Sequence, residues 1–278
     1  MKPTFDAHVH LWEYPWENFI VGTHRAGRFA QRDLLLSLMD RHGVERACVL
    51  AACNQQNPQN HEFVAGLCRA RPDRFVMFSS IPLADPSRDG LLEKTAREWP
   101  AIGLRYMLAP GETPASWCGE ADADFWRRIN DLKLFVSLNL NPAQAAALPP
   151  LIKQFPDITW LLDHMGRPRY DMDDKSYEPV LQLSAYENVY VKISGFYAFT
   201  RVCPDYPYLD LGKFVKKLLD RFGCRRLLWG SDAPPVLDFS SYEQSFACLR
   251  HLLPGVSDED LSWILGGTAR QLFSRRQP

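Results

Sequence analysis

Short apolar runs alternate along the chain with longer amphipathic segments, and this alternation constrains the fold more than any other feature. Several of the runs are rich in Val, Ile or Phe, which is typical of parallel strands buried on both faces. They predict strands over Phe5–His8, Ala47–Ala51, Phe75–Ser79, Ile102–Tyr106, Leu134–Leu138, Thr159–Leu162, Val189–Ile193 and Leu227–Trp229. The amphipathic patterns predict helices over Asp33–His42, His61–Ala70, Asp89–Glu98, Asp122–Asp131, Ala143–Phe155, Tyr177–Ala185, Leu209–Phe222, Tyr242–Leu253 and Asp258–Leu265.

Eight strand–helix alternations indicate a parallel sheet covered by helices, which is an α/β architecture. An open, doubly wound sheet would share this alternation. However, neither GxGxxG nor GxxxxGK[ST] follows a predicted strand, so the nucleotide-binding versions of that fold lack support. The sequence therefore predicts a single-domain (β/α)8 TIM barrel over residues 1–278, and roughly 250 residues is a common length for this fold.

The charge balance and the cysteines limit the possible partners and location. With 32 Lys and Arg against 33 Asp and Glu, the net charge of -1 gives no electrostatic basis for binding nucleic acid or an anionic membrane. Asp6 comes too early for the apolar region of a signal peptide. The seven cysteines are scattered without a CxxC pair, which favours reduced thiols. We expect a cytoplasmic protein with a small-molecule substrate, and the sequence does not indicate its oligomeric state.

His8-Val9-His10 is the sharpest local motif, because it follows the first apolar run directly. Alternate residues of a strand point the same way, so two imidazoles are expected to project together from the end of this strand. Such a pair can bind a metal ion or polarise one carbonyl group. A lone HxH pair also occurs by chance, and its position after a strand is what raises it above that level.

Two further polar residues stand where predicted strands end. His164 closes the run that begins at Thr159, and Asp232 closes the run that begins at Arg226. Taken alone, His164 would more often be a satisfied interior or loop histidine, and an Asp before Ala-Pro-Pro would more often be a turn residue. A carboxylate at a strand end can also take a proton from water and pass it to a leaving group.

The case for an active site rests on these residues together. The last and first strands adjoin when a barrel closes, and barrel enzymes carry their active sites at the C-terminal ends of the strands. His8, His10, His164 and Asp232 are therefore expected to meet at one mouth. Three histidines and a carboxylate form a hydrolytic constellation.

The motifs resemble those of the amidohydrolase superfamily, and within it the amidohydrolase-related branch, which contains lactonases acting on sugar lactones and on pyrone dicarboxylate. The resemblance covers nearly the whole chain. It is carried by the segments at 5–10 (FDAHVH), 102–106 (IGLRY), 162–168 (LDHMGRP), 191–195 (VKISG), 228–232 (LWGSD) and 266–270 (GGTAR).

The resemblance implies roles for the four residues. His8 and His10 would be metal ligands or would polarise the carbonyl, His164 would help to hold the carbonyl oxygen, and Asp232 would be the general base. Many metal-dependent members carry a bridging Lys or a His on the fifth strand, and residues 134–141 (LFVSLNLN) contain neither. We therefore expect at most one divalent metal ion, zinc or manganese, held by His8, His10 and Asp232. The branch also includes members that work without a metal, so a metal requirement stays open.

Two cations fall within predicted strands, Arg105 at the end of the fourth and Lys192 within the seventh. A cation facing a barrel interior is costly unless it is paired. Either could bind a substrate carboxylate or stabilise a developing oxyanion. The alternatives are a buried ion pair for both residues and an outward position for Lys192.

Long connections after the first and seventh predicted strands are expected to shape the substrate pocket. The first spans 11–32 and the second 195–208, and both contain several aromatic residues that could equally serve only to pack the loops. The polar stretch Asn54–Asn57 follows the second strand at the same end.

Three functions compete on these observations. A lactonase acting on a small, oxygen-rich substrate agrees best with the motifs. A metal-dependent decarboxylase of an aromatic or unsaturated acid is the alternative within the superfamily, although the fifth strand looks less like those enzymes. A barrel that only binds ligand is disfavoured, because a degenerate site would usually have lost one of the four residues.

Overall fold

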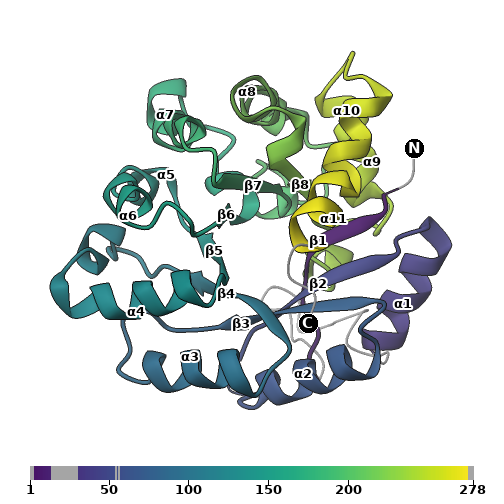
Figure 1. Cartoon of the computed structure of the whole chain (residues 1–278). Helices are drawn as coiled ribbons and strands as arrows, with labels where there is room; N and C mark the ends of the chain where they lie inside the picture. Colours follow the sequence, from purple (N-terminus) through teal and green to yellow (C-terminus); the bar gives the residue numbers. More distant parts are fainter. Residues whose placement is uncertain (1–2, 14–30, 54, 56, 275–278) are drawn as a thin grey trace.

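Eight parallel strands hydrogen-bond in the order in which they occur in the chain (Figure 1). In the computed structural model, which describes residues 3–13, 31–53, 55 and 57–274, each predicted strand is confirmed to within one residue at either end. The strands are β1 (Phe5–Val9), β2 (Arg46–Ala51), β3 (Phe75–Ser80), β4 (Ala101–Met107), β5 (Phe135–Asn139), β6 (Trp160–Leu162), β7 (Val189–Ile193) and β8 (Leu227–Trp229).

The seam between the last and first strands closes the sheet into a barrel. Val9 forms a parallel bridge with Ala233, just beyond the end of β8. The Asp232 amide donates to the His8 carbonyl over 2.8 Å, and the His10 amide donates to the Ala233 carbonyl over 2.7 Å. The predicted (β/α)8 barrel is thus confirmed, and its closing hydrogen bonds involve three residues of the predicted site.

Helices surround the strands in Figure 1, and the last of them, α11, lies beside β1. The helices are α1 (Gln31–His42), α2 (Asn60–Ala70), α3 (Arg88–Arg97), α4 (Glu120–Asp131), α5 (Pro142–Ala145), α6 (Pro149–Gln154), α7 (Asp174–Gln182), α8 (Gly212–Phe222), α9 (Gln244–Leu252), α10 (Asp258–Ser262) and α11 (Thr268–Phe273).

The expectation of one continuous helix over Ala143–Phe155 is wrong. The chain forms two short helices instead, α5 and α6, and α6 begins with Pro149 and Pro150 in its first turn. Proline has no amide hydrogen to donate, so it fits a first turn but interrupts a helix that would pass through it. The apolar periodicity across this segment was real, but the proline pair divides it.

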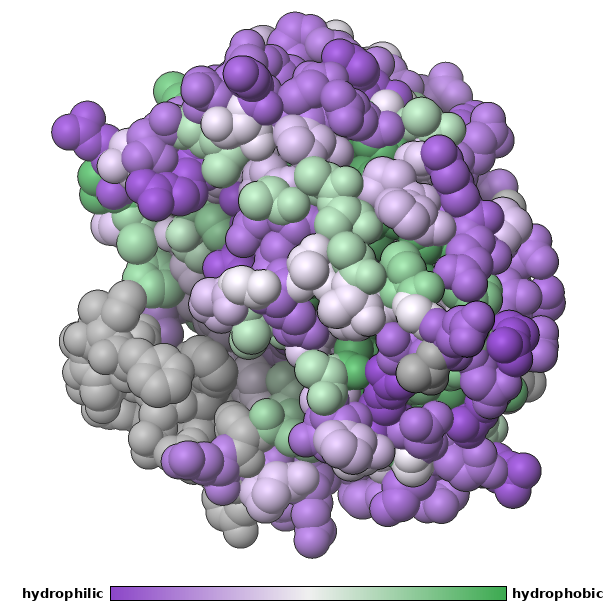
Figure 2. Space-filling model, turned by 90° about the vertical axis from the view of Figure 1, so that its left-hand side faces the viewer, coloured by the Kyte–Doolittle hydropathy of each residue, from purple (hydrophilic) through white to green (hydrophobic). Residues whose placement is uncertain are grey.

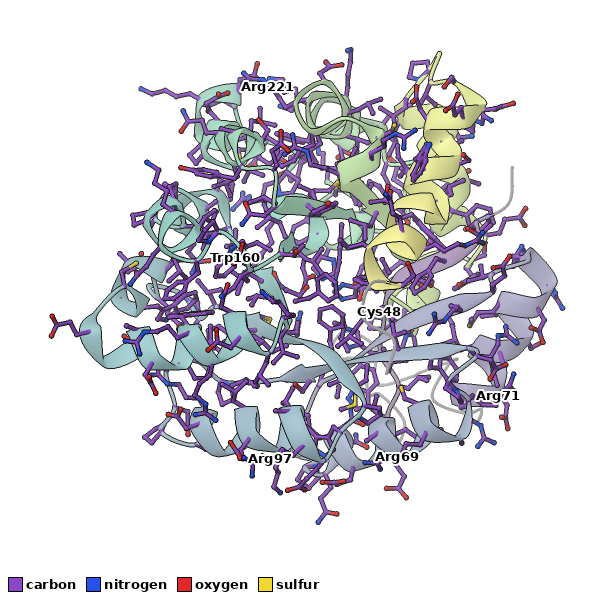
Figure 3. The ribbon with its side chains drawn as sticks, in the orientation of Figure 1. Cys48, Arg69, Arg71, Arg97, Trp160 and Arg221 are labelled. Atoms are coloured by element: carbon purple, nitrogen blue, oxygen red, sulfur yellow. The ribbon has the colours of Figure 1, made fainter. Side chains whose placement is uncertain are left out.

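The main core lies between the sheet and the helices. Trp160 of β6 packs against Trp126 of α4 with ring centroids 5.5 Å apart, and both side chains are buried. Figure 3 shows Arg69, Arg97 and Arg221 at the outer edge of the molecule, whereas Cys48 of β2 lies well inside it. These arginines thus face water, while apolar side chains fill the layer beneath the helices, which is where hydrophobic burial stabilises an α/β fold.

A second apolar cluster fills the N-terminal half of the barrel interior. Phe273 of α11 contacts Phe5 of β1, Phe78 of β3 and Phe135 of β5, with ring centroids 5.5, 5.8 and 5.4 Å away. All four rings are buried. The C-terminal helix therefore closes the end of the barrel opposite the predicted site, and that end is packed rather than open.

The outer face seen in Figure 2 has hydrophilic residues over most of its rim and paler, more hydrophobic ones toward its middle. In the part of the chain that the structure describes, none of the helices combines the length and the apolar character needed to span a bilayer.

Candidate active site

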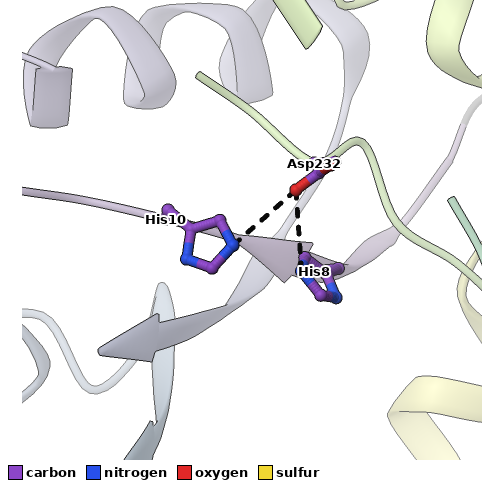
Figure 4. Close-up of side chains that lie close together, drawn as sticks. All are labelled: His8, His10 and Asp232. Carbon is purple, nitrogen blue, oxygen red and sulfur yellow. Dashed lines mark ion pairs between the residues drawn. The ribbon is translucent and has the colours of Figure 1, made fainter. Parts of the chain in front are cut away.

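The seam between β1 and β8 brings His8, His10 and Asp232 together (Figure 4). The pairing of β1 with β2 shifts its register between Asp6 and Val9, where His8 lies. His8 is fully buried, with its Nε2 atom 3.6 Å from Asp232 Oδ1 and its Nδ1 atom 3.5 Å from Asp163 Oδ1. Among the described residues, neither ring nitrogen of His8 has a hydrogen-bond partner.

His10 is oriented by the neighbouring strand. Its Nδ1 atom lies 3.0 Å from the Leu50 carbonyl of β2, so Nδ1 carries the proton and donates it there. The Nε2 atom, which then has a free lone pair, lies 3.7 Å from Asp232 Oδ1. The imidazole stacks on Trp12 with ring centroids 5.2 Å apart. These contacts fix both the tautomer and the direction of the ring.

Asp232 adopts a left-handed backbone conformation with φ of 61°. Non-glycine residues rarely do so, although Asp and Asn tolerate it better than most. The turn is held by the bond from the Asp232 amide to the His8 carbonyl. The Tyr197 hydroxyl donates to Asp232 Oδ2 over 2.7 Å. One carboxylate oxygen is thus occupied by Tyr197, and the other faces the two histidines.

His164 reaches the same site from the end of β6. Its ring centroid lies 4.5 Å from that of His8, and its Nδ1 atom lies 2.9 Å from the Ser194 hydroxyl. A Cβ atom added to Gly195 would stand 2.6 Å from His164 Nδ1, so only glycine leaves room for this ring. All four residues predicted from the sequence therefore lie together at the C-terminal end of the barrel.

Burial affects the charge state of the three imidazoles. It lowers the pKa of His8 well below its ordinary value, against the opposing effect of the Asp163 carboxylate. It lowers the pKa of His10 to about 4, and it also lowers the pKa of His164. The site therefore holds neutral imidazoles near pH 7, which is the form that binds metal ions and can accept or donate single hydrogen bonds.

Arg105 and Lys192 both contact Asp163 in the barrel interior. Arg105 Nε lies 3.1 Å from Asp163 Oδ2, and Lys192 Nζ lies 3.0 Å from Asp163 Oδ1. Ser137 donates to Asp163 and accepts a hydrogen bond from Lys192. Burial alone would raise the pKa of Asp163, but Lys192, His8 and Arg105 outweigh it and hold that pKa well below its usual range.

The two cations differ in how far they reach toward the mouth. Lys192 is fully buried beneath Asp163, which is the buried ion pair that the sequence left open as an alternative. Arg105 retains 9% exposure, and only its Nε atom is used by Asp163. Arg105 is therefore the cation that a molecule entering the barrel could meet.

Sequence reasoning missed several residues of the site. Tyr197 and Ser194 orient Asp232 and His164, and neither was singled out from other loop residues. Asn139, at the end of β5, is 7% exposed, and its Oδ1 atom has no partner among the described residues. Strand alternation could have found Asn139, because it shares a face of β5 with Ser137, which contacts Asp163.

Part of the predicted loops lies outside the described residues. This holds for Tyr14, Trp16, Asn18, Phe19, His24 and Arg25 of the first connection and for Asn54 and Gln56. In the second connection, Phe199 lies beside His164 with ring centroids 6.2 Å apart. That loop therefore supplies both an aromatic wall and, through Tyr197, a hydrogen bond to the site.

The residues present fit a single metal ion. His8, His10 and Asp232 each offer one ligand atom, and these atoms all lie within 4.8 Å of one another. The unpartnered nitrogens of the buried His8 and the free Nε2 lone pair of His10 would gain a partner from such an ion. Two imidazoles and a carboxylate are a donor set that suits zinc.

Comparisons with known proteins give a family match and a shared fold. A family model described as amidohydrolase matches residues 5–275. The L-fucono-1,5-lactonase of Burkholderia ambifaria is 29% identical over 249 residues, covering 82% of this chain and 79% of the relative.

Two solved structures have the same fold. An amidohydrolase from Burkholderia multivorans with bound zinc gives a TM-score of 0.80 at 20% identity, covering 98% of this chain and 99% of the other. A probable 2-pyrone-4,6-dicarboxylic acid hydrolase from Acinetobacter baumannii with bound citric acid gives 0.77 at 19% identity, covering 99% and 100%.

Proposed function

The chain belongs to the amidohydrolase family, and we propose that it is a lactonase that opens the ring of a small sugar or dicarboxylate lactone. The observation that carries the proposal is the position of Asp232, with one carboxylate oxygen held by Tyr197 and the other facing His8 and His10. A general base needs such a free, oriented oxygen within reach of a water molecule. The similarity to L-fucono-1,5-lactonase supports an ester-type substrate.

In the proposed reaction, Asp232 takes a proton from water as the water oxygen bonds to the lactone carbonyl carbon. Negative charge gathers on the carbonyl oxygen, and His164 is placed to stabilise it if the Ser194 hydroxyl donates to Nδ1 and Nε2 carries the imidazole proton. The bond from the carbonyl carbon to the ring oxygen then breaks. Asp232 returns its proton to the departing alkoxide, and the product is a hydroxy acid.

A divalent metal ion, zinc or manganese, would be held by His8, His10 and Asp232 and would supply Lewis-acid polarisation and a more acidic water. Whether turnover requires the ion is decided by activity before and after chelation and metal addition. The proton transfers assigned to Asp232 concern this chain's own carboxylate in either case.

The network below the site supports a substrate-binding role for Arg105 but not for Lys192. We assign contact with substrate oxygens to the part of the Arg105 guanidinium that Asp163 does not use, and to the amide of Asn139. Lys192 acts indirectly, because it contacts Asp163 from beneath and does not reach the mouth of the barrel. Its role is to position Asp163 and, through Asp163, Arg105 and His8.

We also propose that residues 1–278 form one barrel domain and that the protein works in the cytoplasm on a small molecule, rather than on nucleic acid or a membrane. The family match over residues 5–275 supports a single unit. The free cysteines suit a reducing compartment.

The test is a pH-indicator screen of sugar lactones and dicarboxylate lactones, with and without added zinc or manganese. The proposal expects release of acid without carbon dioxide. Carbon dioxide release from an aromatic or unsaturated acid would instead establish the decarboxylase alternative. Ligand binding without turnover, under every metal condition, would refute catalysis altogether.

A further inference from the structure

A cleft of about 490 Å³ lies beside the proposed active site, at the same end of the barrel. Its walls come from the segments that follow β5, β6 and β7, and they include Asn141, Arg167, Met172 and Phe199. Phe199 contributes to both the cleft and the proposed active site, because the centroid of its ring also lies 6.2 Å from that of His164. The cleft is therefore a neighbour of the proposed catalytic residues.

One unusual turn carries both His164 and Arg167. Residues 164–167 all have positive φ, with values of 51°, 60°, 68° and 56°. Left-handed backbone is unfavourable for every non-glycine residue, so the surroundings must hold this turn in place. The Arg167 amide donates to the His164 carbonyl over 2.8 Å, and the Tyr177 hydroxyl donates to the Met165 carbonyl over 2.6 Å. The position of Arg167 is thereby tied to that of His164.

Arg167 is half-buried, and its guanidinium forms no ion pair with any carboxylate in the part of the chain that the structure describes. The other arginine of the cleft, Arg169, is exposed and makes two hydrogen bonds to Asp171, at 3.1 and 2.7 Å. The cleft therefore offers one guanidinium with unused donors. A planar guanidinium matches a carboxylate with two parallel hydrogen bonds.

We propose that this cleft binds the part of the substrate remote from the reacting ester, and that Arg167 there binds a carboxylate. The substrate is then a lactone that carries a second acid group, as the monolactone of a dicarboxylic sugar acid does. This inference rests on the proposed function, because it takes the reacting carbonyl to lie at His164 and Asp232. The shared turn sets the spacing between the group that binds the acid and the group that meets the carbonyl.

The test compares two lactones that differ in one group. Glucaro-1,4-lactone carries a carboxylate at the end remote from its ester, and glucono-1,4-lactone carries a hydroxymethyl group there. Wild type should favour the acid lactone. Arg167→Met keeps an unbranched, apolar stem but removes the guanidinium group, and should lower kcat/KM for the acid lactone about 10- to 100-fold, mainly through KM. Its kcat/KM for the neutral lactone should stay within about threefold of wild type.

Arg169→Met is the matched control, since it removes a cation of the same cleft that Asp171 already occupies. It should change both lactones by less than about threefold. Arg167→Lys should recover part of the loss for the acid lactone. A wild type that prefers the neutral lactone, or an Arg167→Met variant that loses both activities equally, would overturn the assignment.

Failure of this inference can be separated from failure of the lactonase proposal. Calorimetric titration with the open-chain acids, glucarate and gluconate, needs no turnover. Tighter binding of glucarate by wild type, lost in Arg167→Met, supports the acid site even if neither lactone is hydrolysed. Equal binding of the two acids by both proteins refutes it, whatever the hydrolysis assay gives.

Discussion

The two halves of the barrel interior are built from the same eight strands but from opposite kinds of side chain. The N-terminal half is packed with the rings of Phe5, Phe78, Phe135 and Phe273. The C-terminal half holds the Asp163 network and the histidines. Lys192 lies at the boundary, with its ammonium group 5.4 Å from the centre of the Phe78 ring below and 3.0 Å from Asp163 above.

This contrast divides the work of the fold. Burying aromatic rings supplies free energy of folding without demanding a partner for each atom. Buried charges cost free energy unless each is paired, and they add little stability compared with a well-packed apolar core. A protein that keeps several of them in one half of its interior does so for their chemistry. The comparison therefore predicts that substitutions in the two halves affect different measurements.

The largest expected effect belongs to Asp232 in the polar half. Asp232→Asn should lower kcat on a lactone substrate by roughly two to four powers of ten, because the amide cannot take a proton from water. Asn tolerates the left-handed backbone at this position as well as Asp does, so the thermal midpoint should change little. Steady-state kinetics gives kcat and thermal melting gives the midpoint, and both are measured on the same preparation.

An Asp232→Asn protein that is folded and fully active would contradict the mechanism. If Asp232 were only a turn residue, the pattern would be reversed, with a lowered midpoint and near-normal turnover.

Phe273→Ala makes the opposite test in the apolar half. Removing a buried ring that contacts three others should destabilise the protein by about 3–5 kcal/mol. The remaining folded protein should keep its kcat, since the ring lies at the end of the barrel away from Asp232. Urea unfolding and kinetics at low temperature give the two quantities. A large fall in kcat without loss of stability would break the division between the halves.

Much of this division follows from the sequence. The short, continuous apolar runs predict the strands, because a parallel strand that is buried on both faces needs apolar residues on both. Strand ends then predict where His8, His10, His164 and Asp232 meet. This prediction is possible because the C-terminal ends of all strands in a barrel lie at the same mouth, so residues that follow different strands come close together.

The remaining features depend on geometry that the sequence does not express. From the sequence, the Lys192 side chain could face either the barrel interior or the helices outside. Only the folded barrel shows that it points at Asp163. The left-handed turn at 164–167 contains one glycine, so its other positive φ values have no obvious sequence signal. Tyr197 stands among other aromatic loop residues, and its contact with Asp232 depends on how the loop after β7 folds back.

A smaller difference between the two halves is expected in the stabilisation that zinc binding gives to the fold. Zinc-loaded wild type should carry at most one ion per chain, measured by elemental analysis after gel filtration. At free zinc 100-fold above the dissociation constant, the ion should stabilise the fold by about 2.7 kcal/mol. His10→Gln should lose most of that stabilisation, whereas Phe273→Ala should keep it. Two bound ions, or an unchanged response in His10→Gln, would contradict the assignment of His8, His10 and Asp232 as the ligands.

The smallest effect is expected at Tyr197, which acts on the site through its contact with Asp232. Its hydroxyl donates to Asp232 Oδ2 and so fixes which carboxylate oxygen faces His8 and His10. Tyr197→Phe keeps the ring, which stacks on Phe239, and removes only that hydrogen bond. The carboxylate can then rotate, and a smaller fraction of molecules has the base aimed at the water. The expected result is a fall in kcat of about tenfold, equivalent to ~1.4 kcal/mol, with KM nearly unchanged.

Tyr106→Phe is a matched control for Tyr197→Phe. It removes a hydroxyl that also donates to a carboxylate, that of Glu112, but lies outside the cluster of histidines and Asp232. If both variants lowered kcat equally, the loss would reflect general loosening of the barrel mouth. If Tyr197→Phe alone raised KM and left kcat intact, Tyr197 would contact the substrate rather than orient the base.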